Sequence, residues 1–126
     1  MSLLGKRILI IEDEFFLALS VGQALEEQGC AVIGPATSVQ EGLGLIEKTK
    51  VNGAILDINL NGEMVYPVAK ELMDRNIPFV FTTGYRPHDL PSFCYGIPRL
   101  EKPVETGLFI RTLKKVLAQR AGAAGG

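Results

Sequence analysis

Five side chains, far apart along the chain, are of the types that handle a phosphoryl group. They are Glu12, Asp13, Asp57, Thr83 and Lys102, and each lies at or just past the end of a short apolar stretch. Carboxylates held close together must bind a cation or take up protons, because like charges at short range do not all stay ionised unaided. Hard oxygen ligands with room for water and phosphate suit Mg²⁺. The set therefore indicates magnesium-dependent phosphoryl transfer, provided that the fold brings its members together.

Strand-like and helix-like segments alternate along the whole chain, which predicts an α/β fold. The expected strands are residues 6–11, 31–34, 53–57, 78–82 and 99–101, and the expected helices are residues 14–28, a segment carrying Val39, Leu43 and Ile46, residues 64–75 and residues 105–120. Continuous apolar strands between amphipathic helices are typical of a parallel sheet covered on both faces. In the flavodoxin-like, doubly wound order 2-1-3-4-5, the first and third strands end side by side. That order would bring Asp13 next to Asp57.

The segment between Thr83 and Arg99 departs from this alternation. It contains three prolines and two glycines, and prolines remove the backbone donors and φ freedom that a long helix needs. We therefore expect the fourth helix to be short or irregular. Phe93, Cys94 and Tyr95 are predicted to fill the apolar gap beside the sheet.

Composition limits the classes of protein that fit. The chain has 126 residues, of which 47% are hydrophobic and 21% charged, as expected for one globular domain. A net charge of −1 gives no electrostatic footprint for nucleic acid, and no apolar run approaches the ~20 residues that span a bilayer. At the N-terminus the basic residues follow the apolar ones, the wrong order for a secretory signal. We expect a cytoplasmic protein with two reduced thiols, a domain over residues 6–120 and a flexible tail over residues 121–126.

Taken together, these residues resemble the receiver domain of two-component response regulators (CheY-like superfamily), over about residues 6–120. The acidic pair Glu12-Asp13, Asp57, Thr83 and Lys102-Pro103 stand in the family's order, each at a strand end. The stretch 81–85, Phe-Thr-Thr-Gly-Tyr, also resembles the FATGUY-type receivers, which are often stand-alone domains. Two departures are a Thr at position 82, where that subgroup has alanine, and Arg99-Leu100, where the family usually has an aromatic switch residue.

The resemblance implies a role for each position. Asp57 would accept a phosphoryl group from a histidine kinase or histidine phosphotransferase, with Mg²⁺ as cofactor. The implied metal ligands are Glu12, Asp13, Asp57 and the backbone carbonyl of Asn59. Lys102 would bind a phosphoryl oxygen, Thr83 would donate its hydroxyl to the phosphoryl group, and the peptide bond before Pro103 would be cis. Such a domain signals through protein contacts, as a monomer or weak homodimer, and modifies itself rather than turning over a free substrate. Tyr85 could restrict the attacking water.

Three alternatives stay open at this point. A pseudo-receiver would have the same fold and bind partners without phosphorylation, although the intact set of five residues argues against it. A haloacid-dehalogenase-like phosphatase needs a second aspartate two residues after the nucleophile, where this chain has Asn59. A flavin- or nucleotide-binding module would need glycines and free N–H groups in the turn after the first strand, where this chain has acids.

Overall fold

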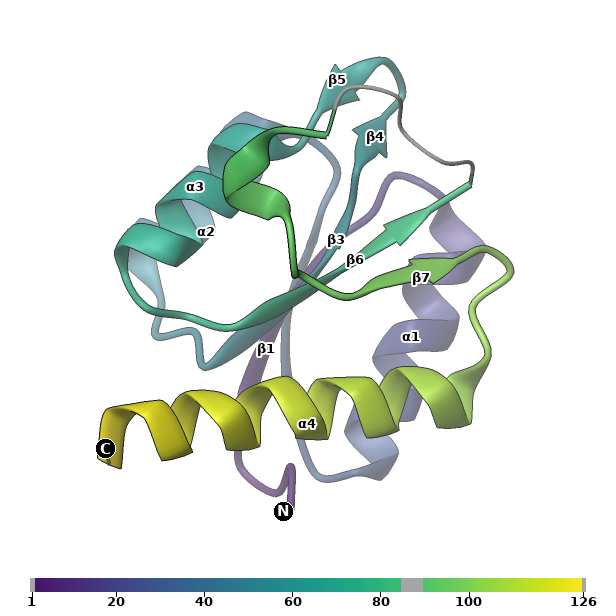
Figure 1. The fold of residues 1–126 in the computed structure, drawn as a ribbon. Helices are drawn as coiled ribbons and strands as arrows, with labels where there is room; N and C mark the ends of the chain where they lie inside the picture. The colour runs from purple at the N-terminus through teal and green to yellow at the C-terminus, as the bar shows by residue number, and fades with distance from the viewer. Residues whose placement is uncertain (1, 85–89, 126) are drawn as a thin grey trace.

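A computed structural model describes residues 2–84 and 90–125 of the chain, the last six of them as backbone alone. Five parallel strands form one twisted sheet at the centre of the molecule in the order β2-β1-β3-β6-β7 (Figure 1). The strands are β1 (Arg7–Ile11), β2 (Ala31–Ala36), β3 (Gly53–Asp57), β6 (Phe79–Thr83) and β7 (Arg99–Glu101). This is the predicted flavodoxin-like order, so the expected switch point lies between β1 and β3.

Four helices cover the two faces of the sheet. They are α1 (Phe15–Glu27), α2 (Val39–Lys48), α3 (Tyr66–Asp74) and α4 (Thr106–Gly125). Figure 1 shows α1 and α4 on one side and α2 and α3 on the other. The core is accordingly divided in two: Leu56 of β3 packs in the α2/α3 cluster, and its neighbour Ile55 packs in the α1/α4 cluster. Alternate side chains of a strand point to opposite faces, which explains why the strands are apolar throughout.

The start of α2 follows from the capping pattern in the sequence. The Ser38 hydroxyl accepts a hydrogen bond from the backbone N–H of Glu41 at 3.1 Å, and the Glu41 carboxylate accepts one from the Thr37 hydroxyl at 2.7 Å. The first of these contacts satisfies a backbone donor that the first turn of a helix leaves without a partner. Gly42 stands inside this helix because a Cβ there would lie 2.5 Å from Cδ1 of Ile11. Close packing of α2 on β1 thus requires a residue without a side chain.

Between β6 and β7, the described residues form a single short 3-10 turn, Ser92–Cys94, in place of a regular fourth helix. The fold confirms that prediction. Cys94 is fully buried in the α2/α3 cluster and Phe93 packs against that cluster, as expected. Tyr95 was expected to join them, and this was wrong, because its side chain is 68% exposed. Both cysteines are free and buried, Cys30 in the α1/α4 cluster and Cys94 across the sheet.

Several boundaries differ from those expected from the sequence. A two-stranded antiparallel hairpin, β4 (Asn59–Leu60) and β5 (Glu63–Met64), follows Asp57. β2 continues through a cis Gly34-Pro35 bond to Ala36, which an edge strand tolerates. α4 continues to Gly125, past the point where the sequence suggests a flexible tail, and its alanines have the highest helix propensity. Within the described residues, no helix combines the length and apolar character that crossing a membrane requires.

Candidate functional site

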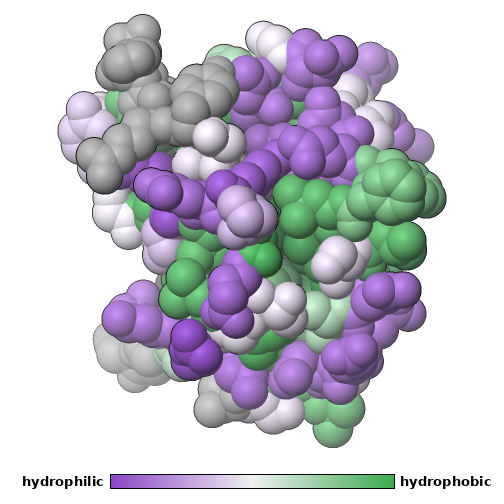
Figure 2. Space-filling view, turned by 90° about the vertical axis from the view of Figure 1, so that its right-hand side faces the viewer, coloured by the Kyte–Doolittle hydropathy of each residue, from purple (hydrophilic) through white to green (hydrophobic). Residues whose placement is uncertain are grey.

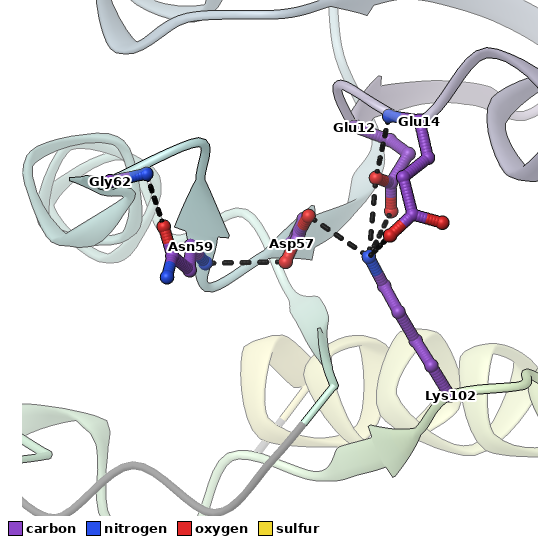
Figure 3. A network of polar contacts seen from close by, with 6 residues as sticks. All are labelled: Glu12, Glu14, Asp57, Asn59, Gly62 and Lys102. Carbon is purple, nitrogen blue, oxygen red and sulfur yellow. Dashed lines mark hydrogen bonds and ion pairs between the residues drawn. The ribbon is translucent and has the colours of Figure 1, made fainter.

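The ammonium group of Lys102 joins three carboxylates at the carboxyl end of the sheet (Figure 3). Its Nζ lies 3.0 Å from Oδ2 of Asp57, 3.1 Å from Oε1 of Glu12 and 3.2 Å from Oε1 of Glu14. Glu12 and Asp57 are about 95% buried, whereas the Glu14 side chain is 62% exposed. The network therefore runs from a buried acidic pair outward to the surface, with one cation at its centre.

Three carboxylates converge where β1 and β3 end. Oxygen atoms of Glu12, Asp13 and Asp57 all lie within 4.8 Å of one another. Asp13 and Asp57 border an open cavity of about 430 Å³, and Glu12 lies behind them. The lining residues are Asp13, Glu14, Asp57, Asn59, Asn61, Gly62, Gly84 and Lys102. A cluster of hard oxygen donors beside a water-accessible cavity is the kind of ligand set that Mg²⁺ takes in proteins, with the remaining positions held by water and phosphate. The donor set therefore fits the magnesium ion that the sequence implies.

The turn after β3 positions Asp57. The backbone N–H of Asn59 donates a hydrogen bond to Oδ1 of Asp57 at 3.2 Å. The side-chain oxygen of Asn59 in turn accepts a hydrogen bond from the N–H of Gly62 at 2.6 Å. Asn61 and Gly62 both have positive φ, 53° and 97°, as the tight hairpin turns favoured by Asn-Gly require. One carboxylate oxygen is thereby held by the backbone, and the other faces Lys102.

Burial makes the two inner carboxylates hard to ionise. Desolvation raises the pKa of Glu12 to about 7, even though the N–H of Glu14 donates a hydrogen bond to it, and the nearby charge of Asp57 adds to the rise. Desolvation also raises the pKa of Asp57, while the hydrogen bond from Lys102 opposes the rise. Without a metal ion, this pair therefore competes for one ammonium group and tends to retain a proton near neutral pH.

Lys102 is fixed by the backbone as well as by its charge partners. Its N–H donates a hydrogen bond to the carbonyl of Thr83 at 2.9 Å, and the bond to Pro103 is cis, as the resemblance implied. Burial lowers the pKa of the ammonium, but the hydrogen bond to Asp57 and the charge of Glu12 outweigh it and hold the pKa of Lys102 above its ordinary value. Lys102 is therefore a permanent cation at this site.

The structure brings Glu12, Asp13, Asp57, Asn59 and Lys102 to one place, as the sequence predicted. Thr83 is buried at the end of β6, next to Gly84 in the cavity wall, and it contacts the network through its carbonyl. Glu14 entered the sequence analysis only as the first residue of the expected helix 14–28, yet it pairs with Lys102. Tyr85 lies outside the described residues.

A match to a protein-family model identifies the family of the chain. Residues 8–96 match the response regulator receiver domain. The chain belongs to this family. The match includes the acidic pair, Asp57 and Thr83, and it stops before Lys102, whose place beside Asp57 comes from the fold. The carboxylates and the lysine described above therefore lie together at the carboxyl end of the sheet of a receiver domain.

Several known proteins are similar to this receiver domain. The transcriptional regulatory protein PdtaR of Mycobacterium tuberculosis is 30% identical over 86 residues, which cover 68% of this chain and 42% of PdtaR. The solution structure of SdrG from Sphingomonas melonis Fr1 is 36% identical, covers 93% of this chain and 99% of SdrG, and superposes with a TM-score of 0.79. The response regulator PhyR from Brucella abortus is 28% identical and covers 98% of this chain and 52% of PhyR, with a TM-score of 0.84. The chain thus spans about half the length of PdtaR and PhyR.

Proposed function

We propose that this receiver domain is a phosphoacceptor of a two-component or phosphorelay system, phosphorylated on Asp57. The observation that carries the proposal is the convergence of three carboxylates, two of which line a cavity whose wall also contains Lys102. A carboxylate can attack phosphorus and form a covalent acyl phosphate. A pseudo-receiver would have no need of this arrangement, which buries two acids at a cost in stability. We further propose that the domain works in the bacterial cytoplasm, where phosphohistidine donors occur, and that it is of the FATGUY type.

In the proposed reaction, an oxygen of Asp57 forms a bond to phosphorus while the bond between phosphorus and the donor histidine nitrogen breaks. Oδ2 is the candidate attacking oxygen, because Oδ1 already accepts the N–H of Asn59. Lys102, 3.0 Å from Oδ2, would transfer its contact to a phosphoryl oxygen and balance the charge that arrives with it. Thr83 would donate its hydroxyl to another phosphoryl oxygen. Hydrolysis of the acyl phosphate by water returns free Asp57. The chain therefore modifies itself rather than turning over a free substrate.

Mg²⁺ would be held by Asp13 and Asp57, by Glu12 directly or through water, and by the backbone carbonyl of Asn59. When bound, it neutralises charge on the transferring phosphoryl group. The carboxylate oxygens lie within 4.8 Å of one another, close enough to share one ion after small side-chain movements. The raised pKa of Glu12 also fits this assignment, because burial and the nearby Asp57 disfavour its charged form, and a divalent ion would supply positive charge beside it.

A protein is the proposed phosphoryl donor, either a sensor histidine kinase or a histidine phosphotransferase. The side chains of Phe15 and Phe16, the first two residues of α1, are 71% and 80% exposed, and Leu19 one turn later is 48% exposed. Figure 2 shows apolar side chains gathered on the side of the molecule where α1 lies. Phe15 follows Glu14 at the rim of the cavity. An apolar surface continuous with the reactive site suits a protein donor better than a small molecule.

Incubation with acetyl phosphate and Mg²⁺, followed by measurement of the intact mass, tests this function. Wild-type protein should gain the mass of one phosphoryl group, and Asp57→Asn should gain none. A wild-type protein that stays unmodified with acetyl phosphate, and also with a panel of phosphorylated histidine phosphotransferases, would support the pseudo-receiver instead.

A further inference from the structure

Glu14 is the most exposed of the carboxylates at the carboxyl end of the sheet. Its side chain is 62% exposed, whereas Glu12 and Asp57 are buried. It lines the open cavity that also contains Asp57, and its Oε1 lies 3.2 Å from Nζ of Lys102 (Figure 3). A phosphoryl donor that enters the cavity to reach Asp57 therefore comes close to the negative charge of Glu14.

The described residues that line this cavity carry more negative than positive charge. Asp13, Glu14 and Asp57 are acidic, and Lys102 is the single basic residue among them. Residues 8–47, which include α1, contain no lysine, arginine or histidine, so this part of the chain brings no compensating cation. With a divalent ion bound, the lining would be close to neutral with Glu14 present and net positive without it.

The proposed reaction does not need a carboxylate at position 14. The three carboxylates whose oxygens lie within 4.8 Å of one another are those of Glu12, Asp13 and Asp57, and Lys102 has to leave Glu14 to contact a phosphoryl oxygen. What Glu14 does supply is a fixed negative charge at the cavity. Repulsion between like charges a few ångströms apart in water changes a rate by a factor of about three for each unit of charge. Glu14 should therefore affect donors in proportion to their charge.

We propose that Glu14 is a specificity-determining residue that selects phosphoryl donors by their charge. It slows transfer from free dianionic donors most. It slows transfer less from donors in which positive charge on a nitrogen leaving group offsets part of the phosphoryl charge, as in a protonated phosphohistidine. This inference rests on the proposed phosphorylation of Asp57. It fits the exposed side chains of Phe15 and Phe16 that follow Glu14, because a protein donor can bind an apolar surface that a small anion cannot.

Two small donors separate the effect of charge from the rest of the reaction. At neutral pH acetyl phosphate is a dianion and phosphoramidate is a monoanion, because the nitrogen of phosphoramidate is protonated. Asp57 takes the phosphoryl group from either donor, and acetate or ammonia leaves. The rate of phosphorylation is measured by intact mass, at saturating Mg²⁺ and low donor concentration, in wild type, Glu14→Gln, Glu14→Asp and Glu27→Gln.

Glu14→Gln should accelerate phosphorylation by acetyl phosphate about tenfold and by phosphoramidate about threefold. Glu14→Asp keeps the charge and should keep the wild-type ratio of the two rates. Glu27→Gln removes an equal charge from an exposed side chain at the other end of α1. That charge lies about 20 Å away along the helix, beyond the screening length of ~10 Å at 0.1 M salt, so both rates should stay unchanged.

Equal acceleration with both donors in Glu14→Gln would mean that Glu14 acts only by holding Lys102, and this outcome would overturn the inference. Unchanged rates in Glu14→Gln, or an equal effect in Glu27→Gln, would overturn it as well. Wild-type protein that accepts a phosphoryl group from neither donor would instead overturn the proposed function, and this inference with it. Should Glu14→Gln fail to fold, Glu14→Ala makes the same comparison.

Discussion

The Nζ atom of Lys102 lies 3.0 Å from Oδ2 of Asp57, although 45 residues separate the two in sequence. β3 and β7 are not neighbours in the sheet, because β6 runs between them. The contact therefore depends on the length and direction of the lysine side chain, which reaches across the end of β6. In the metal-free protein, this single cation is what allows Glu12 and Asp57 to be buried together.

Replacing Lys102 with glutamine should destabilise the metal-free protein. Two carboxylates that are about 95% buried would lose their shared cation, and removing one partner of a buried pair costs roughly 2–4 kcal/mol at a site open to some water. Added Mg²⁺ should restore part of the loss, since it supplies positive charge to the same oxygens. Urea unfolding with and without Mg²⁺ measures both effects.

Lys70→Gln is the matched control for that experiment. Lys70 forms an ion pair with Asp74 at 3.1 Å, but both side chains are more than half exposed, so its loss should change stability by about 0.5 kcal/mol or less. If the two substitutions cost the same, the acid cluster does not depend on Lys102 for its burial.

Asp13 and Glu14 are neighbours at the cavity, yet they should differ in their effect on metal binding. Asp13→Asn removes a proposed ligand and should raise the Mg²⁺ dissociation constant at least about tenfold. Glu14→Gln removes the same negative charge from a side chain that contacts Lys102 and is 62% exposed. This substitution should change the Mg²⁺ dissociation constant about twofold or less. Titration calorimetry on both variants decides this, and equal effects would mean that charge alone, not ligation, sets the affinity.

Magnesium affinity should increase with pH across neutrality. Glu12 has its pKa raised from 4.5 to about 7 by burial, so in the metal-free fold it carries a proton that must leave before the carboxylate can face a cation. The dissociation constant should therefore fall as pH rises between about 6 and 8. Because the folded state binds this proton more tightly than the unfolded state, metal-free stability should fall as pH rises from about 4.5 to about 7 and should level off above that. Glu12→Gln should weaken both trends, and an unchanged pH profile in that variant would contradict the assignment.

Two glycines in α2 should respond differently to alanine. At Gly44 a Cβ would meet no atom within 4 Å, so Gly44→Ala should raise the free energy of unfolding by about 0.5–1 kcal/mol through helix propensity. At Gly42 the Cβ would lie 2.5 Å from Cδ1 of Ile11, and the gain should be cancelled or reversed. Thermal unfolding of the two variants checks the packing of α2 on β1.

The strand order and the meeting of Asp13 with Asp57 could be read from the sequence because alternating apolar strands and helices leave few topologies. The hairpin after Asp57 was not predicted. Its strands have two residues each, too few for any periodic pattern to appear. Asn-Gly is the one signal that could have indicated a hairpin.

Side-chain contacts across the site were harder to foresee. The pairing of Glu14 with Lys102 spans 88 residues and depends on how far two flexible side chains extend, which no local pattern encodes. The exposure of Tyr95 likewise follows from Cys94 and Phe93 having already filled the gap beside the sheet. Motif spacing located the reactive groups, and the fold determined their distances.

The most direct measurement locates the phosphoryl group. After incubation with acetyl phosphate, borohydride reduces an aspartyl phosphate to homoserine, and peptide mass mapping finds the altered residue. We predict homoserine at position 57, formed with Mg²⁺ present and lost when Mg²⁺ is chelated. Modification at another residue, or labelling of Asp57 that is indifferent to the metal ion, would contradict the account.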